Sequence, residues 1–233
     1  LEQVSQNRRY SKVDIVKYNA TDTSWIISGS SEFAFDNDIY IAKLSAKSDS
    51  SGQQIWKTEF NRGVAAIADL ELGPDGDIFI IVGFQDPCYS PLVSYQLYQF
   101  DKNGVLINSN SLSSNFEFLD MFINHDNFVI LASKNQIKAF NSIHINTWSY
   151  SFINNSEKSN IQQLPNGQIF VFRDNLISQF NPQTGALIQS LSTNHRYESI
   201  CQKDEWFYFI DTDGIVSSID TGLNFSTASF NTL

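Results

Sequence analysis

The fold is decided by a pattern that is clearest at residues 73–82, which read GPDGDIFIIV. A polar turn containing Gly, Pro and Asp leads directly into an unbroken series of branched and aromatic residues, the types that favour β-strands. Asp-Gly and Asn-Gly pairs supply the positive φ that tight hairpins require. This stretch therefore predicts a hairpin that leads into a strongly apolar strand.

The same order of polar turn and apolar strand recurs along the chain. The other apolar strands are expected at residues 25–27, 128–131, 169–172 and 206–210. A second hairpin follows each of them, with a turn glycine in every unit except the third, at residues 137–150. Two hairpins make one four-stranded antiparallel sheet, and the unit recurs about every 37 to 53 residues, close to the blade length of a β-propeller.

Sheets of this kind cannot bury both apolar faces alone, whereas packing face to face around an axis buries them. We therefore predict an all-β chain, a β-propeller of about five four-stranded blades, either complete or part of a larger propeller. The blades are expected at about 13–62, 63–114, 115–155, 156–194 and 195–233, with 1–12 as an N-terminal extension or closing strand. A β-sandwich or an irregular β-solenoid is the alternative architecture.

The composition excludes several classes of function. The 233 residues are 42% hydrophobic and 14% aromatic but only 17% charged, as expected where sheets are buried on both faces. The net charge is −10 and the few Lys and Arg are scattered, which argues against a nucleic acid partner. No apolar run approaches the roughly 20 residues of a membrane helix, so no membrane insertion is expected.

Three segments of the first unit resemble the repeat of secreted and surface β-propeller proteins. They are WIISG at 25–29, DIYIAKL at 38–44, and Gly52 followed by IWKT at 55–58. The fourth and fifth units are similar to quinoprotein-type or NHL-like blades. The resemblance implies an extracellular or cell-surface location, turn glycines and Trp56 as a blade-packing aromatic, and it implies no catalytic residue. Sequons at Asn19, Asn154 and Asn224 permit an exterior location.

The most distinctive loop is residues 85–91, which read QDPCYSP. Distinctive loops on rigid scaffolds often bind ligands, and Asp86, Pro87, Tyr89 and Pro91 are therefore the candidate binding residues. We expect a non-catalytic binding or interaction module that uses loops on one face of the propeller, with a protein or glycan ligand and no cofactor.

Two other functions compete with this one. A carbohydrate-active hydrolase would gather carboxylates in the central funnel; the candidates are Asp36, Asp38, Asp69, Glu71, Asp120 and Glu198. A structural subunit of a larger assembly is the other alternative. No metal site is expected, because the histidines, His125, His144 and His195, are far apart in the sequence. Trp25, Trp56, Trp148 and Trp206 recur once per unit in four units, which favours blade packing over sugar stacking.

The two cysteines, Cys88 and Cys201, are too few for a disulfide scaffold. One long-range disulfide and two unpaired thiols are both compatible with the sequence.

Overall fold

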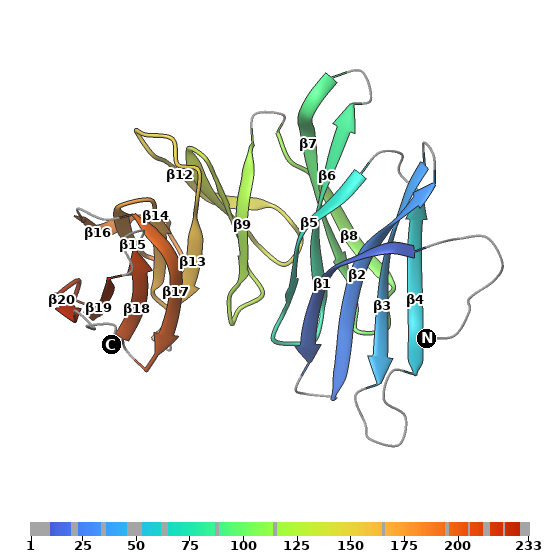
Figure 1. Ribbon diagram of the computed structural model, residues 1–233, viewed down its shortest axis with the longest axis horizontal. Coiled ribbons are helices and arrows are strands. Elements are labelled where there is room, and N and C mark those ends of the chain that lie inside the picture. Colours follow the sequence, from blue (N-terminus) through green and yellow to red (C-terminus); the bar gives the residue numbers. More distant parts are fainter. Residues whose placement is uncertain are drawn as a thin grey trace. The chain divides into compact units, whose positions relative to one another are not determined.

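The computed structural model in Figure 1 describes most of the chain. The described residues are 10–19, 23–33, 36–45, 53–61, 65–86, 89–113, 116–164, 166–193, 196–204, 206–211, 215–220 and 222–228. They form strands and the connections between them, which confirms the all-β prediction. Within these ranges no helix is long and apolar enough to cross a membrane.

The strands form five four-stranded antiparallel sheets, here called blades 1 to 5, in which neighbours in sequence are neighbours in space. Blade 1 contains β1 (Tyr10–Asn19), β2 (Ser24–Phe33), β3 (Asp36–Ser45) and β4 (Gln54–Asn61). Blade 2 contains β5 (Ala65–Leu72), β6 (Ile78–Asp86), β7 (Tyr89–Phe100) and β8 (Leu106–Ser111). Blade 3 contains β9 (Phe118–Ile123), β10 (Val129–Ser133), β11 (Gln136–Phe140) and β12 (Asn146–Ser151). Blade 4 contains β13 (Asn160–Gln163), β14 (Ile169–Arg173), β15 (Leu176–Phe180) and β16 (Leu187–Ser192), and blade 5 contains β17 (Tyr197–Lys203), β18 (Trp206–Asp211), β19 (Val216–Asp220) and β20 (Phe225–Ala228).

The strand β1 begins at Tyr10, so it starts inside the segment 1–12 that the sequence set apart as an extension or closing strand. Residues 1–9 lie outside the described residues. The division of the chain at residue 12 therefore stays a prediction.

The loops of every blade lie at the two ends of its strands, because successive strands alternate in direction. We call these two ends the edges of the blade. The chain enters and leaves a blade at one edge, which also carries the turn between the second and third strands; we call it the entry edge. The other edge carries the turns that follow the first and third strands; we call it the turn edge. The chain divides into two compact units, residues 1–116 with blades 1 and 2, and residues 117–233 with blades 3 to 5.

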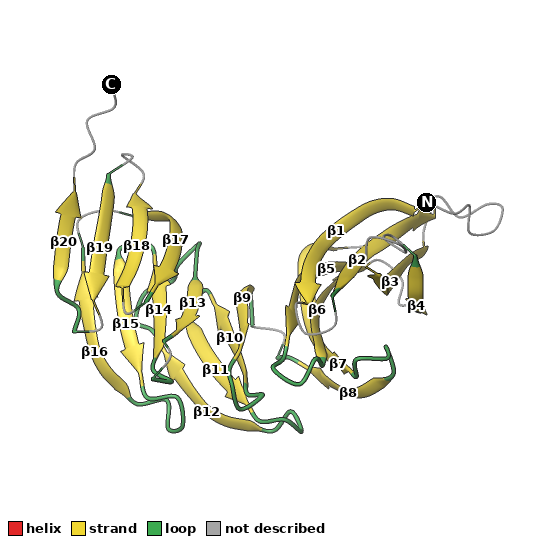
Figure 2. Cartoon of the chain, turned by 90° about the horizontal axis from the view of Figure 1, so that it is seen from below, coloured by secondary structure: helices red, strands yellow, loops and turns green. Residues whose placement is uncertain are grey.

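Blades pack face to face inside each unit (Figure 2). In the first unit, Ile26, Ile39 and Ile41 of blade 1 share a core with Ile78, Ile80 and Val82 of blade 2. In the second, Ile130 and Ile137 of blade 3 pack with Ile169 and Val171 of blade 4, and Phe172 of blade 4 packs with Phe207 and Phe209 of blade 5. The strands β10 and β14 are buried at every position. In β14 this is because Ile169 and Val171 pack against blade 3 while Phe170 and Phe172 pack against blade 5. This packing explains the low charge content.

The turns after the third strands of blades 2 to 5 share one construction. Each begins with an Asp or Asn whose side-chain oxygen accepts two backbone N–H groups; these residues are Asp101, Asn141, Asn181 and Asp220. Each turn also contains a residue at positive φ, namely Gly104, His144, Gly185 or Leu223. Blade 3 therefore forms this turn without glycine, because Asn141 supplies the hydrogen bonds and His144 adopts a φ of 59°.

Two tryptophans connect neighbouring blades at these turns. The Trp56 indole N–H of blade 1 donates to the Lys102 carbonyl of blade 2 at 3.1 Å, and the Trp148 indole N–H of blade 3 donates to the Pro182 carbonyl of blade 4 at 2.9 Å. Both side chains pack on a turn glycine of the next blade, as blade packing predicts. The prediction is wrong for Trp25 and Trp206, which are 40% and 38% exposed. Both lie at the start of a second strand, where the turn edge meets solvent.

Candidate functional site

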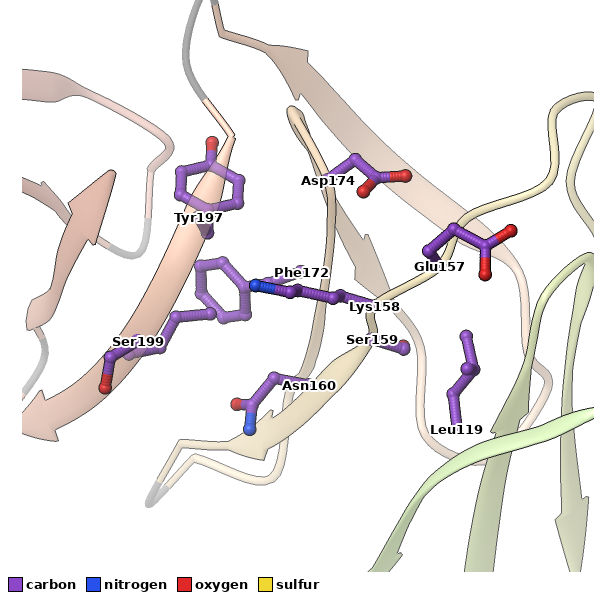
Figure 3. Close-up of a pocket in the computed structure, with 10 residues that line it drawn as sticks. Leu119, Glu157, Lys158, Ser159, Asn160, Phe172, Asp174, Tyr197 and Ser199 are labelled. Carbon is purple, nitrogen blue, oxygen red and sulfur yellow. The ribbon is translucent and has the colours of Figure 1, made fainter. Parts of the chain in front are cut away.

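A pocket of about 330 Å³ opens at the entry edge of blades 3 to 5 (Figure 3). Its residues come from β9, from the segment that leads into β13 and the first residue of that strand, from the end of β14 and the turn after it, and from β17. The apolar part consists of Leu119, Phe172 and Ile200, and the polar part of Glu157, Lys158, Ser159, Asn160, Asp174, Tyr197 and Ser199. Every lining residue belongs to the second unit.

The segment that leads from blade 3 into blade 4 forms one wall of the pocket. Its backbone is held at Ser156, whose N–H donates to the Lys134 carbonyl of blade 3 at 2.8 Å. The Ser156 hydroxyl, which is buried, donates to the Lys158 carbonyl and accepts the Lys158 N–H at 3.3 Å. These bonds fix the backbone from which the Lys158, Ser159 and Asn160 side chains reach the pocket.

Arg173 connects blade 4 to blade 3 next to the pocket. The guanidinium donates to the carbonyls of Lys134 and Asn154, the latter at 3.4 Å, and lies over the Phe152 ring at 3.7 Å from its centroid. The side chain is only 3% exposed, and burial lowers its pKa to about 10. Arg173 is therefore charged at neutral pH and holds two segments of blade 3 at once.

Asp174 connects blade 4 to blade 5 on the other side of the pocket. Its Oδ1 accepts a hydrogen bond from the Arg196 guanidinium at 2.6 Å. Burial alone would raise the pKa of Asp174, but the hydrogen bond and charge of Arg196, with a hydrogen bond from the Glu157 backbone, outweigh it and lower the pKa below its usual value. Asp174 is therefore held in its ionised form.

The Tyr197 hydroxyl has a partner in the segment that leads into blade 5, because it donates to the Thr193 hydroxyl at 2.9 Å. Burial raises the pKa of Tyr197 to about 12, so the phenol is neutral at physiological pH. At the rim, Lys134 forms ion pairs with Glu117 at 2.8 Å and with Glu157 at 3.3 Å. The hydrogen bond from Lys134 to Glu117 is the main cause of a raised Lys134 pKa.

The pocket contains none of the binding residues predicted from the sequence. Asp86 ends β6 and Tyr89 begins β7, and their backbones pair across the turn at the entry edge of blade 2. Pro91 lies within β7, whereas Pro87 falls outside the described residues, as do the side chains of the other three. Their role in binding stays a prediction.

The described carboxylates among the hydrolase candidates have structural partners. Asp69 accepts the Leu70 N–H at 2.7 Å, Glu71 pairs with Lys17 at 2.7 Å, and Asp120 accepts the Ile161 N–H at 2.6 Å. The side chains of Asp36, Asp38 and Glu198 lie outside the described residues. In the part of the chain that is described, no three His, Cys, Asp or Glu side chains are grouped as a metal site requires.

Cys201 is an exposed cysteine on β17. Cys88 lies outside the described residues, so a disulfide between the two cysteines stays a prediction. Among the histidines, His144 is buried in the turn between β11 and β12, and burial lowers its pKa to about 4.

Sequence reasoning missed the pocket because its residues come from four separate segments. Two signals were present. The segment between blades 3 and 4 is long and polar, and residues 173–174 (RD) follow an apolar strand directly at the entry edge.

No family model matches the chain, and no curated protein matches it by sequence. Solved structures do match. A catalytically inactive virginiamycin B lyase from Staphylococcus aureus, solved with quinupristin, has a TM-score of 0.61 at 11% identity, over 94% of this chain and 74% of that chain. BamB from Moraxella catarrhalis has a TM-score of 0.50 at 12% identity, over 93% and 76%. A Bacteroides caccae protein of unknown function has a TM-score of 0.57 at 10% identity, over 89% and 77%.

The chain has the β-propeller fold. The five four-stranded sheets together with these structural neighbours confirm the predicted fold class. The propeller part of the sequence resemblance is confirmed with it.

Proposed function

We propose that this β-propeller chain is a non-catalytic binding module whose ligand sits in the pocket at the entry edge of blades 3 to 5. One observation carries the proposal: a pocket of about 330 Å³ combines apolar and hydrogen-bonding side chains from three blades. Small-molecule sites have this mixed lining and begin at about this volume. Arg173 and the Asp174–Arg196 pair hold the three blades together around it, so the walls are preorganised.

The charge state of the pocket favours binding over glycoside hydrolysis. A hydrolase of this kind needs one carboxyl that is protonated and acts as an acid beside a second that is ionised. Asp174 has a lowered pKa and is bonded to Arg196, and Glu157 is paired at the rim with Lys134. Asp174, with its lowered pKa, is therefore unsuited to the role of the protonated acid.

The ligand class that we propose is a short protein segment or a glycan. The virginiamycin B lyase with a similar fold was solved with quinupristin, and this supports a ligand for the present chain. The predicted loop at Asp86, Pro87, Tyr89 and Pro91 lies on the entry edge of its own blade. From the sequence, we also propose that loop as a separate recognition element of the first unit.

We further propose an extracellular or cell-surface location and a likeness of the last two blades to quinoprotein-type or NHL-like repeats. The support is the sequence resemblance and the exposure of Asn154 in a sequon. Asn224 is a weaker acceptor, because its amide donates to the Asp220 carboxylate at 2.8 Å. Secretion from eukaryotic cells followed by peptide mass spectrometry should find glycan at Asn154.

The proposal is tested by screening peptide and glycan libraries against the isotope-labelled chain by NMR. Ser199→Trp fills the pocket, and Ser190→Trp places the same side chain on an exposed position of β16 as a matched control. Hits should shift the amide signals of residues 157–160 and 197–200 and lose at least about tenfold in affinity in Ser199→Trp only. Hits that bind both variants equally well, or no hit at these residues, would contradict it.

A further inference from the structure

We propose that the outer face of blade 5, which carries Trp206, Tyr208 and Ile210, binds the same face of a second copy of this chain. The result is a two-fold symmetric dimer. This inference does not depend on the proposed ligand-binding function. It follows from the composition of β18, from the way blades stack in the second unit, and from the charges beside Trp206.

The strand β18 has the composition of a strand that is covered on both faces. It begins with WFYFI, five apolar residues in succession, as a fully buried strand does. The strands β10 and β14, which hold the same second position in blades 3 and 4, are buried at every residue. In β18 burial alternates instead. Phe207 and Phe209 are 0% and 2% exposed, whereas the outer residues Trp206, Tyr208 and Ile210 are 38%, 36% and 44% exposed.

The neighbouring strands extend the outer face on both sides of β18. Residues directly opposite one another in antiparallel strands carry their side chains on the same face. Tyr208 lies between Cys201 of β17 and Ser218 of β19, and Ile210 pairs with Val216 of β19. Cys201 is exposed, and Val216 and Ser218 are half-buried. The outer face is therefore three strands wide and has an apolar centre.

The opposite face of blade 5 shows how such a surface is covered in this protein. Phe207 and Phe209 pack there with Phe172 of blade 4, and Ile169 and Val171 on the other face of β14 pack with blade 3 (Figure 2). Alternate residues of the second strands thus meet face to face at each contact between blades of the second unit. The outer face of blade 5 has the same construction, so another sheet with an apolar face would continue the stack.

The outer face is complementary in charge to a second copy of itself. Lys203 on β17 and Asp220 on β19 flank Trp206. A two-fold axis that lies between two such sheets, parallel to β18, places β17 of one copy opposite β19 of the other. Lys203 of each copy then faces Asp220 of the other, and Tyr208 faces its own counterpart at the centre. Asp220 is ionised, because hydrogen bonds, chiefly the one from the Asn224 side chain, lower its pKa.

The apolar and charged parts of this face have different roles in the dimer. Aromatic side chains at the centre of an interface contribute most of its affinity, whereas charges at the rim mainly fix the orientation of the partners. The turn between β17 and β18 also carries Asp204 and Glu205. Association is therefore measured at about 0.15 M salt, where repulsion between the acidic turns of the two copies is screened.

The test is sedimentation equilibrium of the whole chain over a range of protein concentrations. The wild type should dimerise with a dissociation constant below about 100 μM. Tyr208→Lys places two ammonium groups opposite each other on the axis and should raise this constant at least about 100-fold. Because Tyr208 is exposed, the variant should keep its fold, which circular dichroism checks. The control Ile188→Lys adds the same charge at an exposed position of β16 and should leave the constant unchanged.

Two further measurements test where the copies meet. Lys203→Glu sets a carboxylate against Asp220 of the other copy and should raise the dissociation constant by about tenfold. Alkylation of Cys201 by iodoacetamide under reducing conditions, followed by peptide mass spectrometry, reports cover of the outer face. Its rate should fall as the protein concentration rises through the dissociation constant, and should stay constant in Tyr208→Lys.

A chain that stays monomeric up to about 1 mM would overturn the inference. A dimer that forms equally well in Tyr208→Lys would place the contact elsewhere and overturn it too, and a dimer that Lys203→Glu leaves unchanged would overturn the two-fold arrangement. Slow alkylation of Cys201 in a monomeric chain would show that the outer face is covered from within the same chain, which also contradicts the proposal. None of these outcomes bears on ligand binding in the pocket.

Discussion

Replacing Gly185 by Ala tests whether the contact between Trp148 and the turn of blade 4 holds blades 3 and 4 together. Gly185 has a φ of +67°, and a Cβ built on it would lie 2.4 Å from two atoms of the Trp148 ring. Gly167→Ala is the matched control, because Gly167 has a φ of +87° and no atom within 4 Å of its Cβ position. The two variants share the backbone cost and differ in the clash.

The expected magnitude follows from these two terms. An Ala at positive φ costs about 1 to 2 kcal/mol of folding free energy, and the loss of chain entropy in the unfolded state returns about 0.4 to 1 kcal/mol. Gly167→Ala should therefore lower the free energy of unfolding by about 1 kcal/mol. Gly185→Ala adds overpacking against a buried ring, about 1 to 3 kcal/mol more, for a total of about 2 to 4 kcal/mol.

The assay is urea unfolding, measured by tryptophan fluorescence and circular dichroism. The dependence of the free energy of unfolding on urea concentration should be the same in all variants. Combining Gly185→Ala with Trp148→Leu should recover part of the loss, because the smaller side chain removes the clash. Equal losses in Gly185→Ala and Gly167→Ala would refute the reasoning. So would a Gly185→Ala cost that is the same with Trp148 and with Leu at that position.

Three further predictions concern other described contacts. Arg173→Met should lower the free energy of unfolding by about 3 kcal/mol, since two carbonyls lose a buried charged donor; thermal unfolding measures it, with Lys203→Met as an unaffected control. His144 has a folded-state pKa of about 4, below the value of about 6.5 in the unfolded chain. Between pH 6.5 and 4 the unfolded chain therefore binds more protons, and the free energy of unfolding should decrease as the pH is lowered, by at most about 3 kcal/mol. His144→Asn, which tolerates the positive φ, should flatten that part of a stability-versus-pH curve; an unchanged curve would contradict it. Trp56→Phe should cost about 1 kcal/mol in urea unfolding, because the ring remains but the indole bond to Lys102 is lost.

The fold could be predicted because its signals are local. Each blade is built from hairpins whose turn and strands lie within about a dozen residues of one another, as at residues 73–82. The third blade shows where this reasoning weakens. Its turn has no glycine, because Asn141 caps the backbone and His144 takes the left-handed conformation.

The candidate site could not be predicted because it depends on how blades stack. The lining residues come from four separate segments that meet only when blades 3, 4 and 5 stack; among them are Leu119, Lys158, Phe172 and Ser199. The spacing of these residues in the sequence does not predict that they line one pocket. The two exposed tryptophans, Trp25 and Trp206, illustrate the same limit, since their position in the repeat does not say whether a neighbouring blade covers them.

Because the pocket walls come from three separate blades, the free energy of unfolding of the second unit should increase with ligand concentration. Separating blade 4 from either neighbour dismantles the walls, so a bound molecule stabilises the second unit by mass action. At a concentration one hundred times its dissociation constant, a ligand would add about 2.7 kcal/mol. The melting temperature of the second unit within the whole chain thereby reports occupancy of the pocket, whatever the chemistry of the molecule that fills it.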